Sequence, residues 1–286
     1  MHNNKLHFSK IRGLFRRSWM FLFQRIPYKP IIPILDEIDV VIPITKKDLA
    51  VLPLCLEGVR TKVSNRIKDI YIVAAPSEEI KNVCDAYRCK FVDENTVLGF
   101  KPSDLNLIIA GGLDRSGWLF QQFIKLSGAL GTCENYLCID ADHILINPHT
   151  FLSKDGKPVF YMSLDNHQPY FDMISRVSTV LRHSLLSYVS HKMLFNKHHV
   201  MNLQRDIEKQ TGEIWYRGVL DNYDKNEVSG FSEFELYGNY IDDKIKRPWK
   251  QKALKKNEMS NFTDLCRRYG NKYNSLTIPD YAKNYI

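Results

Sequence analysis

Two aspartates separated by one residue end an apolar run in the middle of the chain. Residues 136–148 read YLCIDADHILINP, so Asp140 and Asp142 follow the apolar residues directly. Side chains two positions apart on a strand point the same way, so we expect both carboxylates to face one ligand. Oxygen ligands of this kind suit Mn²⁺ or Mg²⁺, which bridge to substrate phosphates. The spacing therefore predicts a divalent-cation site, although a DxD pattern alone also marks turns and helix caps.

Short apolar segments and longer helical patterns alternate along the first half of the chain. The segments 39–45, 69–76, 89–94 and 136–140 are typical of strands. Residues 49–63, 78–87 and 116–130 carry helical patterns between them. This order predicts a parallel sheet covered by helices, and such sheets bind ligands beyond the carboxyl ends of their strands. The two aspartates stand at that edge.

The second half of the chain departs from this order. Segments 158–165 and 187–195 are further strand candidates, separated by aromatic loops and helices. We expect them to extend the same sheet and not to form a second domain. The predicted organisation is a basic aromatic segment and linker over 1–36 and one α/β domain over 37–286, which includes a basic segment at 244–256.

Positive charge is concentrated in two short segments of this chain of 286 residues. Of 40 Lys and Arg residues, seven lie in 1–35, where there is no acid, and seven more lie in 244–256. The rest of the chain is mildly acidic, because it carries all 32 Asp and Glu residues against 26 Lys and Arg residues. This distribution argues against a nucleic-acid-binding protein and for local attraction to phosphates or to an anionic membrane surface. For 244–256, a solvated charge run is an equal alternative.

The N-terminal segment combines arginines with large apolar side chains. Leu14, Phe15, Trp19 and Leu22 fit a helix that lies on a membrane surface, or one that packs against the domain. The apolar run 19–23 is far shorter than the roughly 20 residues needed to cross a bilayer. Six cysteines without a CxxC pair fit a reducing compartment. We therefore expect a cytoplasmic protein, peripheral on the inner face of the cytoplasmic membrane if the first alternative holds.

Five segments together resemble the GT-A glycosyltransferases. They are DVVIPIT at 39–45, RSGWLFQQFIKL at 115–126, CIDADHILINPHTFL at 138–152, SHKMLF at 190–195 and SGFSEFELYGNY at 229–240. More closely, the chain resembles a family of bacterial transferase-like proteins of polysaccharide loci. The resemblance implies a GT-A (Rossmann-like) fold, a mainly parallel sheet flanked by helices. It also implies metal-dependent transfer of a sugar from a nucleotide-sugar donor to a glycan or glycolipid acceptor, such as lipopolysaccharide, capsule or exopolysaccharide.

The resemblance also implies where the donor binds. Asp140 would face the ribose or the metal, and Asp142 would be the main ligand of Mn²⁺ or Mg²⁺. In such enzymes a helix just before the DxD often contacts the donor, and Gln122 and Lys125 share a face of this helix. A solvated helix face is the alternative. The predicted donor-binding residues are Pro43, Thr45, Lys46, Arg115, Gln122, Lys125, Asp140, Arg247 and Lys250.

The basic segment and one histidine have two interpretations each. Arg247 and Lys250 would close over the donor diphosphate, as C-terminal segments do in some GT-A enzymes, or would belong to a patch that faces lipid. His191 is a candidate third ligand of the metal or of a phosphate, although a lone histidine is more often structural.

A polar and aromatic segment after the DxD predicts the acceptor site. Asp165, His167 and Tyr170 belong to it, and aromatic rings stack on sugars while polar groups bond their hydroxyls. Ordinary stabilisation of a loop by the same residues is the alternative.

Two glutamates late in the chain are candidates for catalysis. Ser232 is placed to cap a short helix that begins near Glu233. An inverting transferase needs a carboxylate to accept the acceptor's hydroxyl proton, and the resemblance implies a base in this region. We expect Glu233 as the base and Glu235 as a ligand of the acceptor hydroxyl, or the reverse order. The alternative is an acid favoured by the helix dipole, with no chemistry.

Two other classes of protein compete with this prediction. A nucleotidyltransferase or phosphotransferase would also use paired carboxylates, but it usually carries a phosphate loop, glycine-rich or basic, after its first strand. The corresponding segment here, VIPITKKD at 41–48, has no glycine. A non-catalytic glycan-binding protein is the third class, and paired acids at a strand end disfavour it.

Overall fold

A five-stranded sheet in the order β3-β2-β1-β4-β7 forms the middle of the molecule. The computed structural model describes residues 2–25 and 29–278, with side chains from residue 13 onward. The strands of this sheet are β1 (Glu37–Pro43), β2 (Arg66–Ala74), β3 (Lys90–Asp93), β4 (Asn135–Ile139) and β7 (Lys192–Asn196). The first four are parallel, whereas β7 runs antiparallel to β4. The prediction of a mainly parallel sheet is confirmed.

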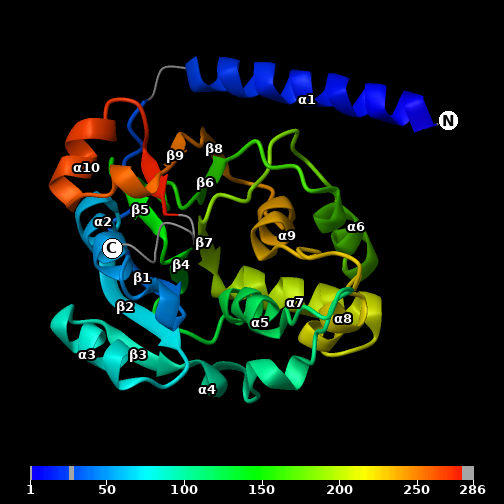
Figure 1. The fold of residues 1–286 in the computed structure, drawn as a ribbon, viewed down its shortest axis with the longest axis horizontal. Helices are drawn as coiled ribbons and strands as arrows, with labels where there is room; N and C mark the ends of the chain where they lie inside the picture. The colour runs from blue at the N-terminus through cyan, green and yellow to red at the C-terminus, as the bar shows by residue number, and fades with distance from the viewer. Residues whose placement is uncertain (1, 26–28, 279–286) are drawn as a thin grey trace.

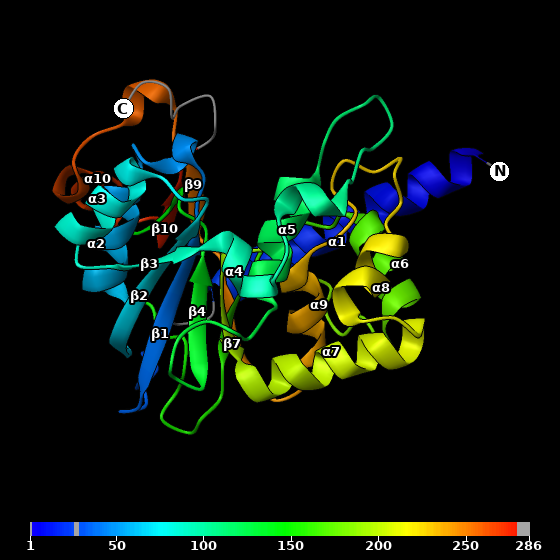
Figure 2. The same ribbon diagram turned by 90° about the horizontal axis from the view of Figure 1, so that it is seen from below.

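Helices cover both faces of this sheet, as Figure 2 shows. On one side lie α2 (Leu52–Lys62), α3 (Glu78–Ala86) and α10 (Phe262–Tyr269), and on the other α5 (Ser116–Lys125), α7 (Lys197–Thr211) and α9 (Glu233–Tyr240). The apolar run of β1 explains this arrangement. Val40 packs in the core beneath α2 and α3, and its neighbour Val41 packs in the core beneath α5, α7 and α9. A strand buried on both faces is typical of the centre of a parallel sheet.

Smaller elements surround the main sheet (Figure 1). β5 (His143–Leu145), β10 (Ser275–Thr277) and β9 (Gln251–Ala253) form a second sheet in that order, and β6 (Val159–Met162) pairs with β8 (Ile245–Pro248) in a third. The remaining helices are α4 (Glu94–Leu98), α6 (Gln168–Val177) and α8 (Trp215–Asp221), with 3-10 turns η1 (Lys46–Asp48), η2 (Pro102–Leu105) and η3 (Lys256–Glu258).

Three predicted elements differ from the structure. The segment 158–165 does not extend the main sheet, because its strand β6 pairs with β8 instead. The segment 187–195 becomes a strand only from Lys192, so His191 lies just before β7. The helix expected over 116–130 ends at Lys125, and three residues later Gly128 takes the left-handed backbone conformation (φ 65°) that turns the chain.

The N-terminal helix α1 (His2–Arg25) attaches to the domain by its last turns and extends along one side of it (Figure 1). Met20 is buried, and Nε2 of Gln24 donates to the carbonyl of Trp249 at 3.4 Å. In contrast, Phe15, Trp19 and Leu22 are 70%, 54% and 58% exposed. Within the described residues, no helix is long and apolar enough to cross a membrane. The linker expected over 27–34 lies partly outside the described residues.

Candidate active site

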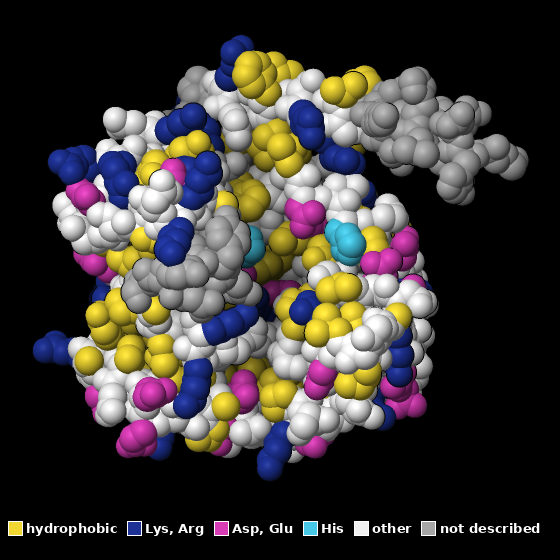
Figure 3. All heavy atoms as spheres, viewed as in Figure 1, with side chains coloured by type: hydrophobic (Ala, Val, Ile, Leu, Met, Phe, Trp, Pro, Cys, Tyr) yellow, Lys and Arg dark blue, Asp and Glu magenta, His cyan; other side chains and the backbone are white. Residues whose placement is uncertain are grey.

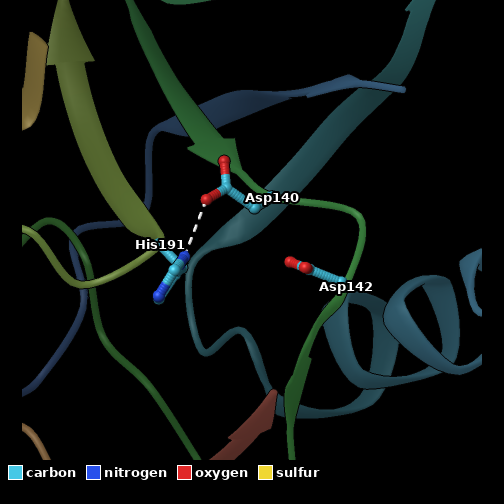
Figure 4. Close-up of side chains that lie close together, drawn as sticks. All are labelled: Asp140, Asp142 and His191. Carbon is cyan, nitrogen blue, oxygen red and sulfur yellow. Dashed lines mark hydrogen bonds and ion pairs between the residues drawn. The ribbon is translucent and has the colours of Figure 1, made fainter. Parts of the chain in front are cut away.

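Asp140, Asp142 and His191 form a cluster at the carboxyl end of β4 (Figure 4). One ligand atom from each lies within 4.8 Å of the others. Both aspartates lie just past the strand, in a turn where the amide of His143 donates to the carbonyl of Asp140 at 3.0 Å. This turn, and not strand alternation, directs both carboxylates to one place. Two carboxylate oxygens and one imidazole nitrogen fit a divalent cation such as Mn²⁺ or Mg²⁺.

The antiparallel direction of β7 brings His191 to this cluster. Lys192, the first residue of β7, pairs with Ile139, the last of β4. His191 therefore lies beside Asp140, where its Nδ1 is 2.9 Å from Oδ2 and its carbonyl accepts from the Asp140 amide at 2.9 Å. Its backbone adopts a φ of 59°, which is strained for a residue with a side chain. Such strain is typical of functional sites, and the paired bonds to Asp140 hold it in place.

A buried lysine links the cluster to α9. Nζ of Lys125 lies 2.7 Å from Oδ1 of Asp140 and 2.8 Å from Oε1 of Glu233. With its amide nitrogen turned toward Glu233, Gln122 donates to the same carboxylate. Gln122 and Lys125 thus share a face of α5, as predicted, but this face is buried and not solvated.

The charges around Lys125 stabilise one another. Burial disfavours the ammonium, but the carboxylates of Asp140 and Glu233 outweigh it and raise the pKa of Lys125. Burial likewise opposes the charge of Asp140, yet Lys125 and His191 bring the pKa of that carboxyl below its ordinary value. For Glu233 burial prevails over Lys125, so its pKa is raised. The site therefore contains an ammonium that stays charged between carboxylates.

Glu235 is held inside the domain by other bonds. Its Oε2 accepts from Oγ of Ser187 at 2.6 Å and from the amide of Tyr188 at 3.0 Å, and its Oε1 accepts from Nδ2 of Asn239 at 3.2 Å. Burial raises the pKa of Glu235. Ser232 caps α9 as predicted, because its Oγ accepts from the Glu235 amide at 3.2 Å. Glu235 fixes the 187–188 backbone, and its role toward an acceptor stays a prediction, as does that of Glu233.

The predicted nucleotide-binding segment lies beside the aspartates. Val41 pairs with Cys138, so Pro43 at the end of β1 reaches the same sheet edge as Asp140. Thr45 donates through its amide and its hydroxyl to Oδ2 of Asp48, at 2.8 and 2.9 Å. This places Pro43 and Thr45 at the carboxyl edge of the sheet, where the aspartates lie.

Two other predicted donor residues have different surroundings. The side chain of Lys46 is 70% exposed and its Nζ lies 3.4 Å from Glu79. Arg115 stands at the opposite end of α5 from Lys125, with its guanidinium 4.3 Å from the centre of the Trp118 ring. The structure does not place Arg115 in the cluster around Asp140.

The predicted acceptor residues lie in α6 and in the loop before it, and the surface of the molecule has a central hollow (Figure 3). The rings of His167 and Tyr170 are 4.7 Å apart, and Asp165 is exposed. Burial, and after it the charges of Asp165 and Glu233, raise the pKa of Tyr170. Figure 3 shows the hollow, with hydrophobic, acidic and histidine side chains around it. The role of these three residues toward an acceptor stays a prediction.

Arg247 and Lys250 do not join the aspartate cluster. They line a cavity of about 420 Å³. Asp140, Asp142 and His191 do not contribute to the lining of this cavity. Between them in sequence, Trp249 does approach the cluster, with its ring 5.9 Å from that of His191.

Sequence reasoning missed a second buried pair behind the cluster. Nζ of Lys192 lies 2.9 Å from Nε2 of His143, and both side chains are fully enclosed. Burial lowers the pKa of each group well below its ordinary value. A lysine opening the otherwise apolar strand KMLF was the available signal, since a buried lysine needs a partner.

Comparison with known proteins gives a family and remote structural likenesses. Residues 35–264 match the Family of unknown function (DUF6492), and the chain belongs to that family. No curated protein matches the chain. Among solved structures, mouse xyloside xylosyltransferase 1 in its apo form is 14% identical, with 85% of this chain and 97% of that chain covered and a TM-score of 0.45. An active-site mutant of LgtC is 13% identical, with 84% and 87% covered and a TM-score of 0.45.

Proposed function

We propose that the protein is a metal-dependent glycosyltransferase of the GT-A class that uses a nucleotide-sugar donor. The observation that carries this proposal is the cluster of Asp140, Asp142 and His191 at the carboxyl end of β4. These residues would hold Mn²⁺ or Mg²⁺, which supplies positive charge to the leaving diphosphate when bound. The end of β1 beside them, with Pro43 and Thr45, would hold the nucleotide.

The residues of α5 and α9 would position the donor sugar. Lys125 stays protonated because Asp140 and Glu233 flank it, so it presents a fixed ammonium beside the predicted diphosphate. A buried charge that is already oriented needs little reorganisation during the reaction. If the transfer inverts the anomeric configuration, Glu233 would be the carboxylate that takes the acceptor proton, because Lys125 links it to Asp140 at the proposed donor site.

The acceptor would be a glycan or glycolipid of a bacterial surface polysaccharide. Asp165, His167 and Tyr170 offer the aromatic and polar groups that sugars bind. A lipid-linked acceptor would fit a protein held at the membrane surface by α1, whose exposed Phe15, Trp19 and Leu22 stand among arginines. The domain that carries the activity would be residues 37–286.

A donor-hydrolysis screen tests the proposal. UDP-, GDP-, CMP- and dTDP-sugars are incubated with the protein in Mn²⁺, Mg²⁺ or EDTA, and free nucleotide is measured. We expect slow release of one nucleoside diphosphate or monophosphate that needs the metal and is lost in Asp142→Asn. Asp155→Asn, the same change at an exposed position, is the matched control. Release of sugar 1-phosphate in place of the free sugar from a nucleoside-diphosphate sugar would indicate attack on the nucleotidyl phosphorus, as in nucleotidyl transfer, and would contradict the proposal.

A further inference from the structure

A cavity of about 420 Å³ lies away from the aspartate cluster, where the end of α1 meets the rest of the domain. Phe23 and Gln24 of α1 line one side, and Arg247 and Pro248 of β8 line another. Two bonds hold these walls together. Gln24 donates to the carbonyl of Trp249, and Nη2 of Arg247 donates to the carbonyl of Lys29 at 2.6 Å. The end of α1 therefore forms one wall of the cavity. This end lies next to the connection between β8 and β9 (Figure 1).

The chemistry of the lining is both apolar and cationic. Carbon surfaces come from Phe23, Ile31, Pro148, Tyr161 and Pro248. The ionisable side chains besides the Tyr161 phenol are Arg247 and Lys250, and no Asp or Glu of the described residues lines the cavity. A ligand that complements such a lining has an anionic head and an apolar part. A free phosphate would use the charges but leave the carbon surfaces uncovered.

The apolar surface of the cavity continues onto α1. Phe23 lies four residues after Trp19 and eight after Phe15, so the three share one side of the helix, and Trp19 and Phe15 are 54% and 70% exposed. Arg16, Arg17 and Arg25 accompany them, and the described part of α1 carries no acid. A helix of this composition binds the interface of an anionic bilayer, where phospholipids are the molecules at hand.

We infer that this cavity is a binding site for one anionic phospholipid. Arg247 and Lys250 bind the phosphate of the headgroup, Phe23, Ile31 and Pro248 contact the glycerol and the start of an acyl chain, and the chain continues along α1 into the bilayer. The volume lies within the range of small-molecule sites, about 300–1,000 Å³. The site would fix the orientation of the domain on the membrane. The inference rests on the cavity and α1, and not on the proposed glycosyl transfer.

Calorimetry of the full chain with soluble short-chain lipids tests this inference. Dihexanoyl phosphatidylglycerol, below its micelle concentration, is compared with dihexanoyl phosphatidylcholine and with inorganic phosphate. We expect saturable binding of one phosphatidylglycerol, at least about tenfold weaker binding of phosphatidylcholine and none of phosphate. Equal binding of the two lipids, or binding of phosphate as tight as that of phosphatidylglycerol, would overturn the inference.

Two pairs of variants locate the site. Arg247→Gln with Lys250→Gln should weaken phosphatidylglycerol binding at least about tenfold. Lys246→Gln on β8 with Lys252→Gln on β9, both outside the cavity lining, should not. Ile31→Glu should abolish binding by placing an acid in the lining, whereas Ile32→Glu, at a neighbour that is 62% exposed, should not. Circular dichroism checks that each variant folds. If a cavity variant and its control bind phosphatidylglycerol equally well, the lipid does not occupy this cavity.

Discussion

Nζ of Lys125 and Oδ1 of Asp140 lie 2.7 Å apart at the centre of the candidate site. This contact ties the helix before the DxD to the first aspartate of the motif. Because the same ammonium also pairs with Glu233, one cation neutralises acids from two distant parts of the chain. The first aspartate of the motif and the first residue of α9 are thereby coupled electrostatically.

Loss of Asp142 should abolish metal-dependent donor binding. Asp142→Asn keeps the size of the side chain but removes a negative charge that cancels metal charge, so the loss should exceed the roughly 10–100-fold that an outer-shell change costs. Calorimetry with Mn²⁺ and the nucleotide sugar found in the screen measures it, with Asp155→Asn as control. Unchanged affinity in Asp142→Asn would remove the metal site from the mechanism.

Removal of Lys125 alone should destabilise the fold. Lys125→Met leaves Asp140 and Glu233 without their shared cation, and breaking a buried ion pair costs about 3–5 kcal/mol. The double change with Glu233→Gln should recover part of this free energy of unfolding, measured in urea. As a control, Lys157→Met breaks an exposed pair with Asp243, 2.8 Å apart, and should cost about 0–1 kcal/mol. Equal losses in Lys125→Met and Lys157→Met would contradict this prediction.

Substitutions of Glu233 and of Glu235 should have different effects on the rate of sugar transfer. If Glu233 is the base of an inverting reaction, Glu233→Gln should lower the transfer rate by about 10²–10⁴-fold while donor affinity changes little. Glu235→Gln keeps acceptors for Ser187 and Tyr188, so it should act mainly through the backbone that Glu235 holds. Transfer at wild-type rates by both variants would make this segment purely structural.

Acid should destabilise the protein through His149. Burial, and after it Lys192, lowers the pKa of His149 from 6.5 to about 3. Since the unfolded chain binds a proton below about pH 6.5 that the folded chain binds only near pH 3, stability falls as the pH drops through this window. His149→Asn should reduce the dependence of the unfolding free energy on pH by about 1.4 kcal/mol per unit.

The control for this pH dependence is a histidine on the surface. His198→Asn changes an exposed residue, and the unfolding free energy measured between pH 4 and 7 should keep its slope. A slope that His149→Asn leaves unchanged would show that His149 takes up its proton in the folded state as readily as in the unfolded chain.

The N-terminal segment should govern attachment to membranes and not the chemistry. Deletion of residues 1–30 removes the exposed Phe15, Trp19 and Leu22 together with seven basic residues, so binding to anionic vesicles should fall. Activity on a soluble acceptor should persist. Vesicle sedimentation measures this, and raising the salt should weaken binding of the full chain because surface charges are screened. Equal sedimentation of both proteins would reject the role of α1.

The sequence by itself determined the elements whose pattern is local. The alternation of apolar strands and helices predicted the mainly parallel sheet, and the apolar run before Asp140 placed the DxD at its carboxyl edge. The spacing of Gln122 and Lys125 predicted their shared face, and Ser232 predicted the start of α9. Each of these depends on neighbours a few residues away, which the sequence displays directly.

Only the tertiary structure decided which distant side chains meet. The local sequence pattern of a strand does not reveal its direction or its partner. The antiparallel pairing of β7 with β4, which brings His191 to Asp140, could therefore not be predicted, and neither could the pairing of β6 with β8. Burial of Lys125 between Asp140 and Glu233 depends on α5 and α9 packing over the same sheet face. For the same reason, the sequence could not show that Arg247 and Lys250 line the cavity beside α1 and lie outside the aspartate cluster. Long-range packing, and not composition, decides which groups surround a charged residue.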